Sequence, residues 1–291
     1  MNNNDLKIQK KQSSFDIYRY QLLVSTAIQL KIDGRFNSIE EIRESKNLIL
    51  ENILRNEKFR FFSNKSSIES KLIISEGNIL VFRIAVERTA KVYKKDFTED
   101  ELENWPNILV VVNNSPNVQK IAIQKNYKAF GNNSTVAALI EESLEPKLKN
   151  ENIDFYIEPL FDKNEFWRLA EKYTNRIVQV SFDLISPNLA NISKNLKIDL
   201  RQLNHDTNTQ KTKLELNSNK GSNLVLENDS EIIQSLVEYA SEGGGNIDIK
   251  VKGFRKKFRT NRTVQQISID EILISSNNLE SGVNRFKDLL N

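Results

Sequence analysis

Short apolar runs separated by turn residues fill the first half of the chain, and they constrain its fold more than any other feature. Four runs of this kind are joined in pairs by Gly77-Asn78 and by the polar residues 113–117: 71–76, 79–88, 108–112 and 118–124. Aliphatic and β-branched runs joined by such short turns predict β-hairpins. We therefore expect the four segments to be neighbouring antiparallel strands that share a buried face.

Segments with helical periodicity alternate with these runs. Ser38 stands three residues before Glu41 in the capping-box arrangement, and apolar residues then recur at helical spacing over 39–56. An acidic stretch that begins at Thr98 predicts a short helix that ends before Pro106. The other predicted helices cover 134–149, 164–173, 189–203, 231–240 and 278–290.

Strands are also predicted outside the hairpins, and the mixture sets the fold class. These strands cover 15–32, 153–158, 176–185, 213–216, 246–252 and 264–274. The pattern predicts an α+β protein with a β-rich N-terminal half of antiparallel hairpins and an α/β C-terminal half. We expect a flexible N-terminal arm over 1–14, a β-rich domain over 15–160 and an α/β domain over 161–291.

The composition excludes several classes of site. The chain has 291 residues, no cysteine and a single histidine, which rules out disulfides, a thiolate nucleophile and Cys-based zinc or iron–sulfur sites. Three residues separate Arg201 from His205, fewer than usually separate the arginine and histidine of HEPN ribonucleases, so we expect His205 to be dispensable. We predict no catalytic residue, no metal ligand and no cofactor.

The hydropathy pattern bears on location. No stretch reaches 18 consecutive apolar residues, and the start of the chain lacks an apolar signal region. We therefore expect a soluble cytoplasmic protein without direct membrane insertion.

The segment from Lys250 to Arg262 (KVKGFRKKFRTNR) is the densest cluster of positive charge in the chain. It holds no acidic residue and interleaves Phe254 and Phe258 with its cations. Phosphates attract such clusters through charge and counterion release, and an exposed ring can stack on a base. The other interpretations are a solvated loop whose two rings lie in the core, or a contact for an acidic protein or lipid. The predicted nucleic-acid-binding residues are Lys250, Lys252, Phe254, Arg255, Lys256, Lys257, Arg259 and Arg262.

The triple glycine Gly243–Gly245 invites comparison with phosphate-binding loops. Those loops lead from a strand into a helix N-terminus, where the phosphate binds. Here the predicted helix precedes the glycines and a strand follows them. The order therefore predicts a helix end and a turn.

Carboxylates near lysines leave a metal-dependent nuclease open as the alternative function. Glu69–Lys71 and Glu145–Lys147 have the Glu-x-Lys spacing, and Asp154 and Glu158 lie on one face of a predicted strand. Such a site needs an aspartate and a Glu-x-Lys pair that converge from adjacent strands. No upstream aspartate stands at the end of a predicted strand.

Two stretches carry a family resemblance. The opening strand SFDIYRYQLL and the helix–glycine–strand unit LVEYASEGGGNIDIK, together with the order of the two halves, resemble the bacterial and prophage exclusion proteins of the lambda RexA and Kiwa KwaB type. The resemblance implies DNA binding in antiphage defence, often with a membrane partner encoded alongside.

The sequence thus predicts a non-catalytic nucleic-acid-binding protein, with DNA favoured and antiphage defence as its setting. We expect a homo-oligomer, in its simplest form a homodimer, and a protein partner encoded nearby. The alternatives are the nuclease and a scaffold whose basic segment contacts an acidic partner.

Overall fold

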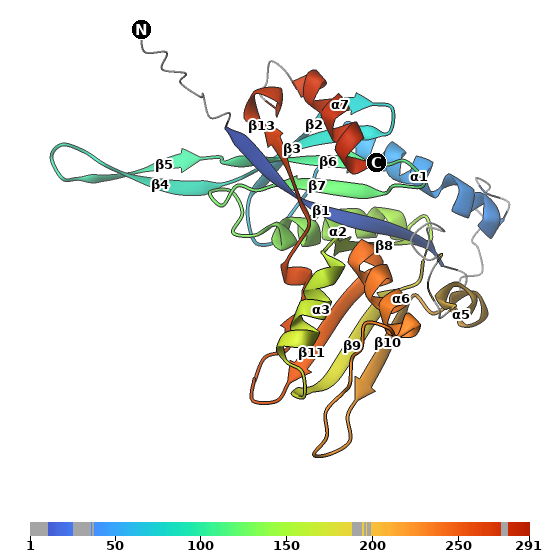
Figure 1. The fold of residues 1–291 in the computed structure, drawn as a ribbon. Coiled ribbons are helices and arrows are strands. Elements are labelled where there is room, and N and C mark those ends of the chain that lie inside the picture. Colours follow the sequence, from blue (N-terminus) through green and yellow to red (C-terminus); the bar gives the residue numbers. More distant parts are fainter. Residues whose placement is uncertain are drawn as a thin grey trace, which may run out of the picture.

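The computed structural model shows two large β-sheets, one above the other in Figure 1 and each covered by helices, and a separate two-stranded sheet. The structure describes residues 11–25, 36, 38–187, 194, 196, 199–274 and 279–291. Within these residues the predicted α+β class is confirmed, because antiparallel sheets and helices are interleaved and the N-terminal half is rich in strands.

The first sheet has seven antiparallel strands, and it contains the predicted hairpins. Its order is β13-β1-β7-β6-β3-β2, and β8 pairs with the remaining part of the β1 edge. The strands are β1 (Gln12–Val24), β2 (Ile68–Glu76), β3 (Ile79–Val86), β6 (Asn107–Asn113), β7 (Lys120–Gln124), β8 (Ile153–Pro159) and β13 (Gln266–Asp270). The four apolar runs are thus neighbouring antiparallel strands, as predicted.

Both faces of this sheet are buried, which explains why its strands have continuous apolar runs. On β1, Tyr18 and Tyr20 face a core that includes residues of α1 (Ile39–Arg55) and α2 (Asn133–Lys149). Phe15 faces the opposite core, where its ring meets Phe286 of α7 (Leu279–Leu290) with the centroids 5.0 Å apart. The side chains of β1 therefore alternate between two cores.

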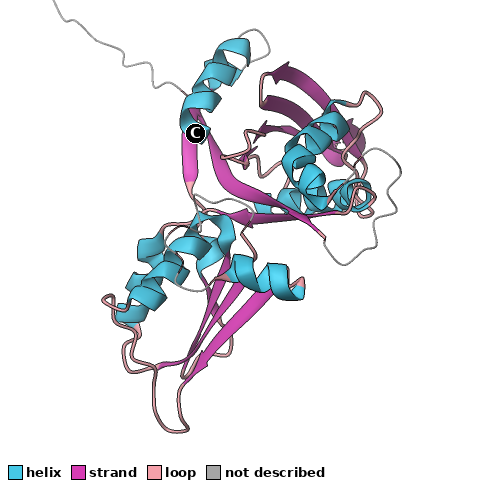
Figure 2. Cartoon of the chain, turned by 90° about the vertical axis from the view of Figure 1, so that its right-hand side faces the viewer, coloured by secondary structure: helices cyan, strands magenta, loops and turns pink. Residues whose placement is uncertain are grey.

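The second sheet has the order β10-β9-β11-β12 and one covered face. Its strands are β9 (Ile177–Ile185), β10 (Lys211–Asn217), β11 (Gly245–Val251) and β12 (Phe258–Arg259). Figures 1 and 2 show α3 (Lys163–Lys172) and α6 (Glu231–Tyr239) on the same face, over a core that includes Phe166, Phe182 and Leu236. The other face presents polar residues such as Lys213, Asp183 and Lys250.

The triple glycine joins the two sheets. The helical turn Ala240–Gly244 follows α6, and Gly243 adopts a φ of +83°. A Cβ on Gly243 would lie 2.5 Å from Cβ of Arg19. The buried guanidinium of Arg19 donates to the carbonyl oxygen of Glu242 (2.6 Å), and Gln21 Nε2 donates to that of Gly243 (3.1 Å). The glycines are thus a helix end and a turn, as their order predicted, and they let this turn pack against β1.

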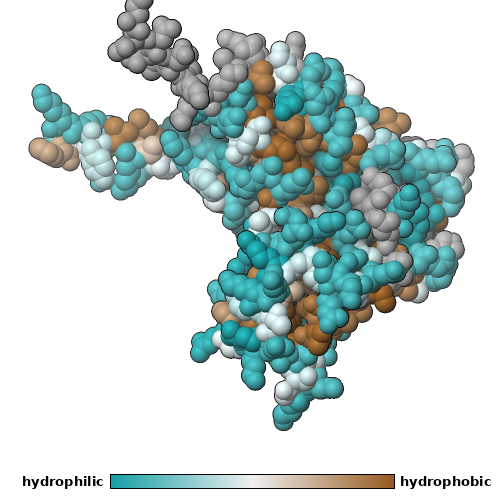
Figure 3. Space-filling model, viewed as in Figure 1, coloured by the Kyte–Doolittle hydropathy of each residue, from teal (hydrophilic) through white to brown (hydrophobic). Residues whose placement is uncertain are grey.

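The predicted acidic helix after Thr98 is wrong. Residues of this stretch form β5 (Glu99–Asn104), which pairs with β4 (Arg88–Tyr93) in a separate two-stranded sheet. This β4–β5 hairpin stands clear of the body of the protein in Figures 1 and 3. Its acidic strand lies opposite a basic one, with ion pairs Lys91–Glu99 (2.9 Å) and Lys94–Asp100 (2.6 Å). Cross-strand charge pairing has overridden the local helical preference.

The ends of the chain depart from the predicted division. β1 begins at Gln12, inside the predicted arm over 1–14, because Gln12 pairs with Asp270 of β13. The predicted C-terminal domain over 161–291 does not stay together, since β13 and α7 return to the first sheet and pack there. The second unit, which consists of the second sheet and the helices that cover it, thus ends near residue 262.

Smaller differences concern element bounds. The predicted strand over 264–274 is β13 followed by a 3-10 turn at Glu271–Ile274. Of the predicted helix over 189–203, residues 200–203 are helical and belong to α5 (Leu200–Thr207), whereas 188–193, 195, 197 and 198 lie outside the described part of the chain. The backbone of His205 lies in α5, and its side chain lies outside the described residues.

Candidate nucleic-acid interface

The basic segment forms a hairpin at the edge of the second sheet. It starts in β11, turns after Val251 and returns through β12 into a 3-10 turn at Thr260–Arg262. Two register pairs, Asp248 with Arg259 and Ile249 with Phe258, hold its strands together. Seven of the eight predicted binding residues are exposed and Lys257 is half-buried; the exposed ones are Lys250, Lys252, Phe254, Arg255, Lys256, Arg259 and Arg262.

The cations of this segment have few partners of opposite charge. Arg259 Nε lies 3.1 Å from Asp248 Oδ1 on the neighbouring strand. Among the described residues, this is the one ion pair that a cation of the segment makes. The segment therefore concentrates positive charge that the fold itself leaves largely uncompensated, which favours polyanion binding.

An aromatic cluster anchors the hairpin. The ring of Phe254 meets those of Tyr173 and Phe258, with centroids 5.5 and 5.2 Å apart. Arg176 places its guanidinium 5.5 Å from the Phe254 ring and donates from Nη2 to the carbonyl oxygen of Lys252 (3.0 Å). Phe258 is half-buried against the second core, whereas Phe254 remains 42% exposed. The structure thus separates the two rings: Phe258 packs inward, and Phe254 keeps a surface that a ligand can reach.

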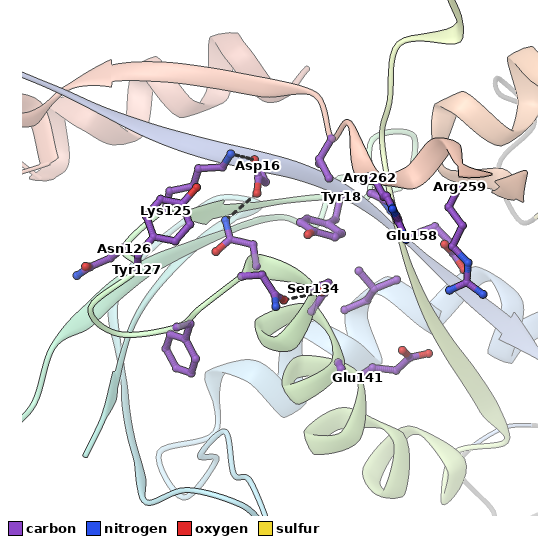
Figure 4. A pocket seen from close by; sticks show the side chains of 18 residues that line it. Asp16, Tyr18, Lys125, Asn126, Tyr127, Ser134, Glu141, Glu158, Arg259 and Arg262 are labelled. Atoms are coloured by element: carbon purple, nitrogen blue, oxygen red, sulfur yellow. Dashed lines mark hydrogen bonds and ion pairs between the residues drawn. The ribbon is translucent and has the colours of Figure 1, made fainter. Parts of the chain in front are cut away.

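A cleft of about 580 Å³ lies between the two units, and the end of the basic segment forms one of its walls (Figure 4). Arg259 and Arg262 line that wall. The opposite wall consists of β1, β8, the N-terminal part of α2 and the loop 125–132. The cleft therefore brings residues that are far apart in the sequence to the base of the basic hairpin.

Two buried or partly buried carboxyls line the cleft. Asp16 Oδ1 lies 3.1 Å from Lys125 Nζ, and Asp16 Oδ2 accepts a hydrogen bond from Asn133 Nδ2 (3.1 Å). Burial raises the pKa of Asp16 in spite of these contacts. Burial, together with repulsion from Glu141, raises the pKa of Glu158 to about 7. The Glu158 carboxyl is thus partly protonated near neutral pH.

The loop at the mouth of the cleft carries an exposed aromatic residue. Tyr127 is 74% exposed, and Lys125 and Lys128 flank it in the sequence. A hydrogen bond from Arg88 Nη2 to the carbonyl oxygen of Ala129 (2.7 Å) fixes the position of this loop. Sequence patterns had not singled out Tyr127, because one tyrosine between two lysines is common in a solvated loop.

The two Glu-x-Lys pairs of the nuclease alternative lie on different elements, Glu69–Lys71 on β2 and Glu145–Lys147 on α2. Burial raises the pKa of Tyr156, and Asp154 and Glu145, which both lie near it, help to raise that pKa. Glu69 and Lys71 are exposed on β2, the edge strand farthest from β8. Asp154 on β8 forms an ion pair with Lys149 (3.5 Å) and accepts a hydrogen bond from Gln210. Across the described ranges, no group of three or more His, Asp or Glu side chains is placed to hold a metal ion.

Comparisons with known protein families, with curated protein sequences and with solved structures found no match to this chain. In the described part of the chain, no helix is both long and apolar enough to cross a membrane.

Proposed function

We propose that this protein binds nucleic acid, with DNA as the favoured ligand, and that it binds through the basic hairpin without catalysing a reaction. One observation carries the proposal: seven cations lie in 13 consecutive positions, and among the described residues they form one ion pair, Arg259 with Asp248, while Glu215 offsets part of the charge of Lys257. Displacing condensed counterions from phosphates is favourable for such a cluster and needs no shape match.

The position of the hairpin supports the same proposal. Lys250 and Arg259 lie on the open face of the second sheet, Lys252, Arg255 and Lys256 are exposed in the turn between them, and Arg262 lines the cleft. A nucleic-acid backbone can thus run from the tip of the hairpin along this face to the cleft. The resemblance to phage-exclusion proteins suggests antiphage defence in the cytoplasm as the setting.

The test is the salt dependence of binding. We expect Arg255→Ser, Lys256→Ser and Lys257→Ser together to weaken binding to a duplex of about 20 base pairs. Because each phosphate contact contributes roughly 0.9 to the log–log slope of affinity against salt, the triple variant should flatten that slope by about 2 to 3. Fluorescence anisotropy from about 50 to about 200 mM salt measures it. Unfolding free energy should change by less than about 1 kcal/mol.

A matched triple variant controls for loss of positive charge in general. Lys91→Ser, Lys94→Ser and Lys95→Ser remove three cations from the other projecting hairpin, where Lys91 and Lys94 are paired with carboxylates. The slope should then stay within about 0.5 of that of the parent. Equal slopes for the parent and the basic-hairpin variant would contradict the proposal. Binding to an acidic protein but to no nucleic acid would favour the scaffold alternative.

A further inference from the structure

The cleft beside the basic hairpin has features that phosphate binding does not require. Its volume of about 580 Å³ falls in the range of pockets that enclose small organic ligands. Its lining combines cations, carboxyls, aromatic rings and amides, whereas the basic hairpin over 250–262 holds no carboxylate. The cleft therefore fits a ligand that carries both an anionic group and a flat polar ring.

Cations lie on two sides of the cleft mouth. Arg259 and Arg262 lie on the wall formed by the end of the basic segment, and Lys125 lies on the loop opposite, with the exposed Lys128 next to it in the chain. Lys125 is engaged by Asp16, and Arg259 by Asp248. Arg262 is exposed and makes no ion pair with another described residue, so it is the group best placed for a phosphate next to the cleft.

Tyr127 supplies a ring at the same mouth. It is 74% exposed, and no ring of another described residue packs against it. Figure 4 shows Tyr127 beside Lys125 and Asp16 at the end of the cleft away from Arg259. An exposed ring between lysines is the arrangement on which bases of a single strand stack.

The interior offers polar groups that other described residues leave without hydrogen bonds. These groups are the hydroxyl of Tyr18 and the carboxyls of Glu141 and Glu158, all of which line the cleft. The Glu158 carboxyl, with its pKa raised by burial, can both donate and accept near neutral pH. Such groups can hydrogen-bond the edge of a base, provided that this edge is not already paired with a second strand.

We infer that the cleft binds a short unpaired stretch of a nucleic-acid strand, with one base against Tyr127 at one end of the cleft and the edge of the base that follows it toward Tyr18, Glu141 and Glu158. The neighbouring phosphate lies at Arg262. This inference rests on the proposed function and deepens it, because it makes the protein a reader of single-stranded or locally unpaired nucleic acid. A fully paired duplex contacts the basic hairpin alone.

The test compares one variant on two ligands. Tyr127→Ala should weaken binding to a single strand of about 20 nucleotides by about five- to a hundred-fold, the loss expected when one base stack is removed. Binding to the matched duplex should stay within about two-fold of the parent. Tyr93→Ala is the control, because Tyr93 is also exposed (69%) but lies on the β4–β5 hairpin. It should leave both affinities unchanged.

A second variant reports on the interior. Tyr18→Phe keeps the packing of the ring and removes its hydroxyl, so it should change the order of preference among single-stranded homopolymers by several-fold for at least one base. Unchanged duplex binding in this variant shows that the protein is folded.

The outcomes separate the two proposals. A parent protein that binds neither ligand overturns the proposed function and this inference with it. A parent that binds both, with Tyr127→Ala unchanged on the single strand, overturns the inference alone. If Tyr127→Ala weakens the affinity for duplex and for single strand equally, the inference is also overturned, because the contribution of the ring to binding would then not require an unpaired base.

Discussion

Two charged hairpins project from this protein, and they handle their charge in opposite ways. The β4–β5 hairpin has four cations and five carboxylates between residues 88 and 104. The basic hairpin over 250–262 has seven cations and no carboxylate. The β4–β5 hairpin pairs its charges across its own strands, whereas the basic hairpin forms one ion pair, to Asp248 in the middle of β11.

Their anchoring differs as well. The basic hairpin is fixed to the second core by the rings of Phe254, Phe258 and Tyr173. The β4–β5 hairpin exposes its apolar residues, including Tyr93 (69%) and Phe97 (94%), and its strands pair with each other alone. An isolated two-stranded hairpin is marginally stable in water. The basic hairpin, with its largely unpaired charge and its aromatic anchor, therefore fits the proposed binding of nucleic acid better than the self-paired β4–β5 hairpin does.

The largest effect that we expect tests the anchoring. Phe258→Ala should lower the free energy of unfolding by about 2 to 3 kcal/mol, because it removes a half-buried ring from the aromatic cluster. Tyr93→Ala, the same kind of truncation on the other hairpin, should cost less than about 0.5 kcal/mol. Denaturant titration of both variants measures the difference. Similar losses would show that the two hairpins are anchored alike.

The partly buried carboxyl of Glu158 in the cleft contrasts with the exposed carboxyls of the β4–β5 hairpin. The pKa of Glu158 rises from 4.5 to about 7 on folding. Between these values the folded state holds the proton more tightly than the unfolded state, so this group makes stability fall as the pH rises. Glu158→Gln should therefore stabilise the protein at pH above about 7, by about 1 to 3 kcal/mol, and should have little effect near pH 4.

Glu101→Gln on the exposed strand β5 is the control for that variant. It should change stability by less than about 0.5 kcal/mol at either pH. Thermal unfolding of the two variants at both pH values measures these changes in stability. A pH-independent gain for Glu158→Gln would mean that packing, and not its charge, determines the effect.

The smallest effect concerns the tip of the β4–β5 hairpin. Phe97 adopts a φ of +64°, which a bulky side chain rarely takes. Asparagine tolerates this conformation, so Phe97→Asn should stabilise the hairpin by about 0.5 to 1 kcal/mol. Amide hydrogen exchange of the hairpin should slow by about two- to five-fold, with the rest of the protein unchanged. Faster exchange would indicate that Phe97 makes a stabilising contact.

Local patterns in the sequence determined much of the secondary structure. Runs such as 79–88 and 108–112 contain enough adjacent apolar residues to require a buried strand, and Ser38 caps the helix that follows it. The gathering of cations after Val251 was also predictable, because no acidic residue occurs between Asp248 and Asp270. These features depend on residues within a few positions of one another.

Other features were decided by contacts between distant segments. Residues 99–104 form a strand because the cations of β4 lie opposite them, and β13 leaves the second unit because β1 offers it a free edge. The cleft draws Tyr18, Tyr127, Glu158 and Arg262 from four separate parts of the chain. No spacing in the sequence marks such a set, because each member depends on a different element for its position. The sequence therefore determined where positive charge gathers, and the tertiary structure alone decided which rings and carboxyls lie beside it.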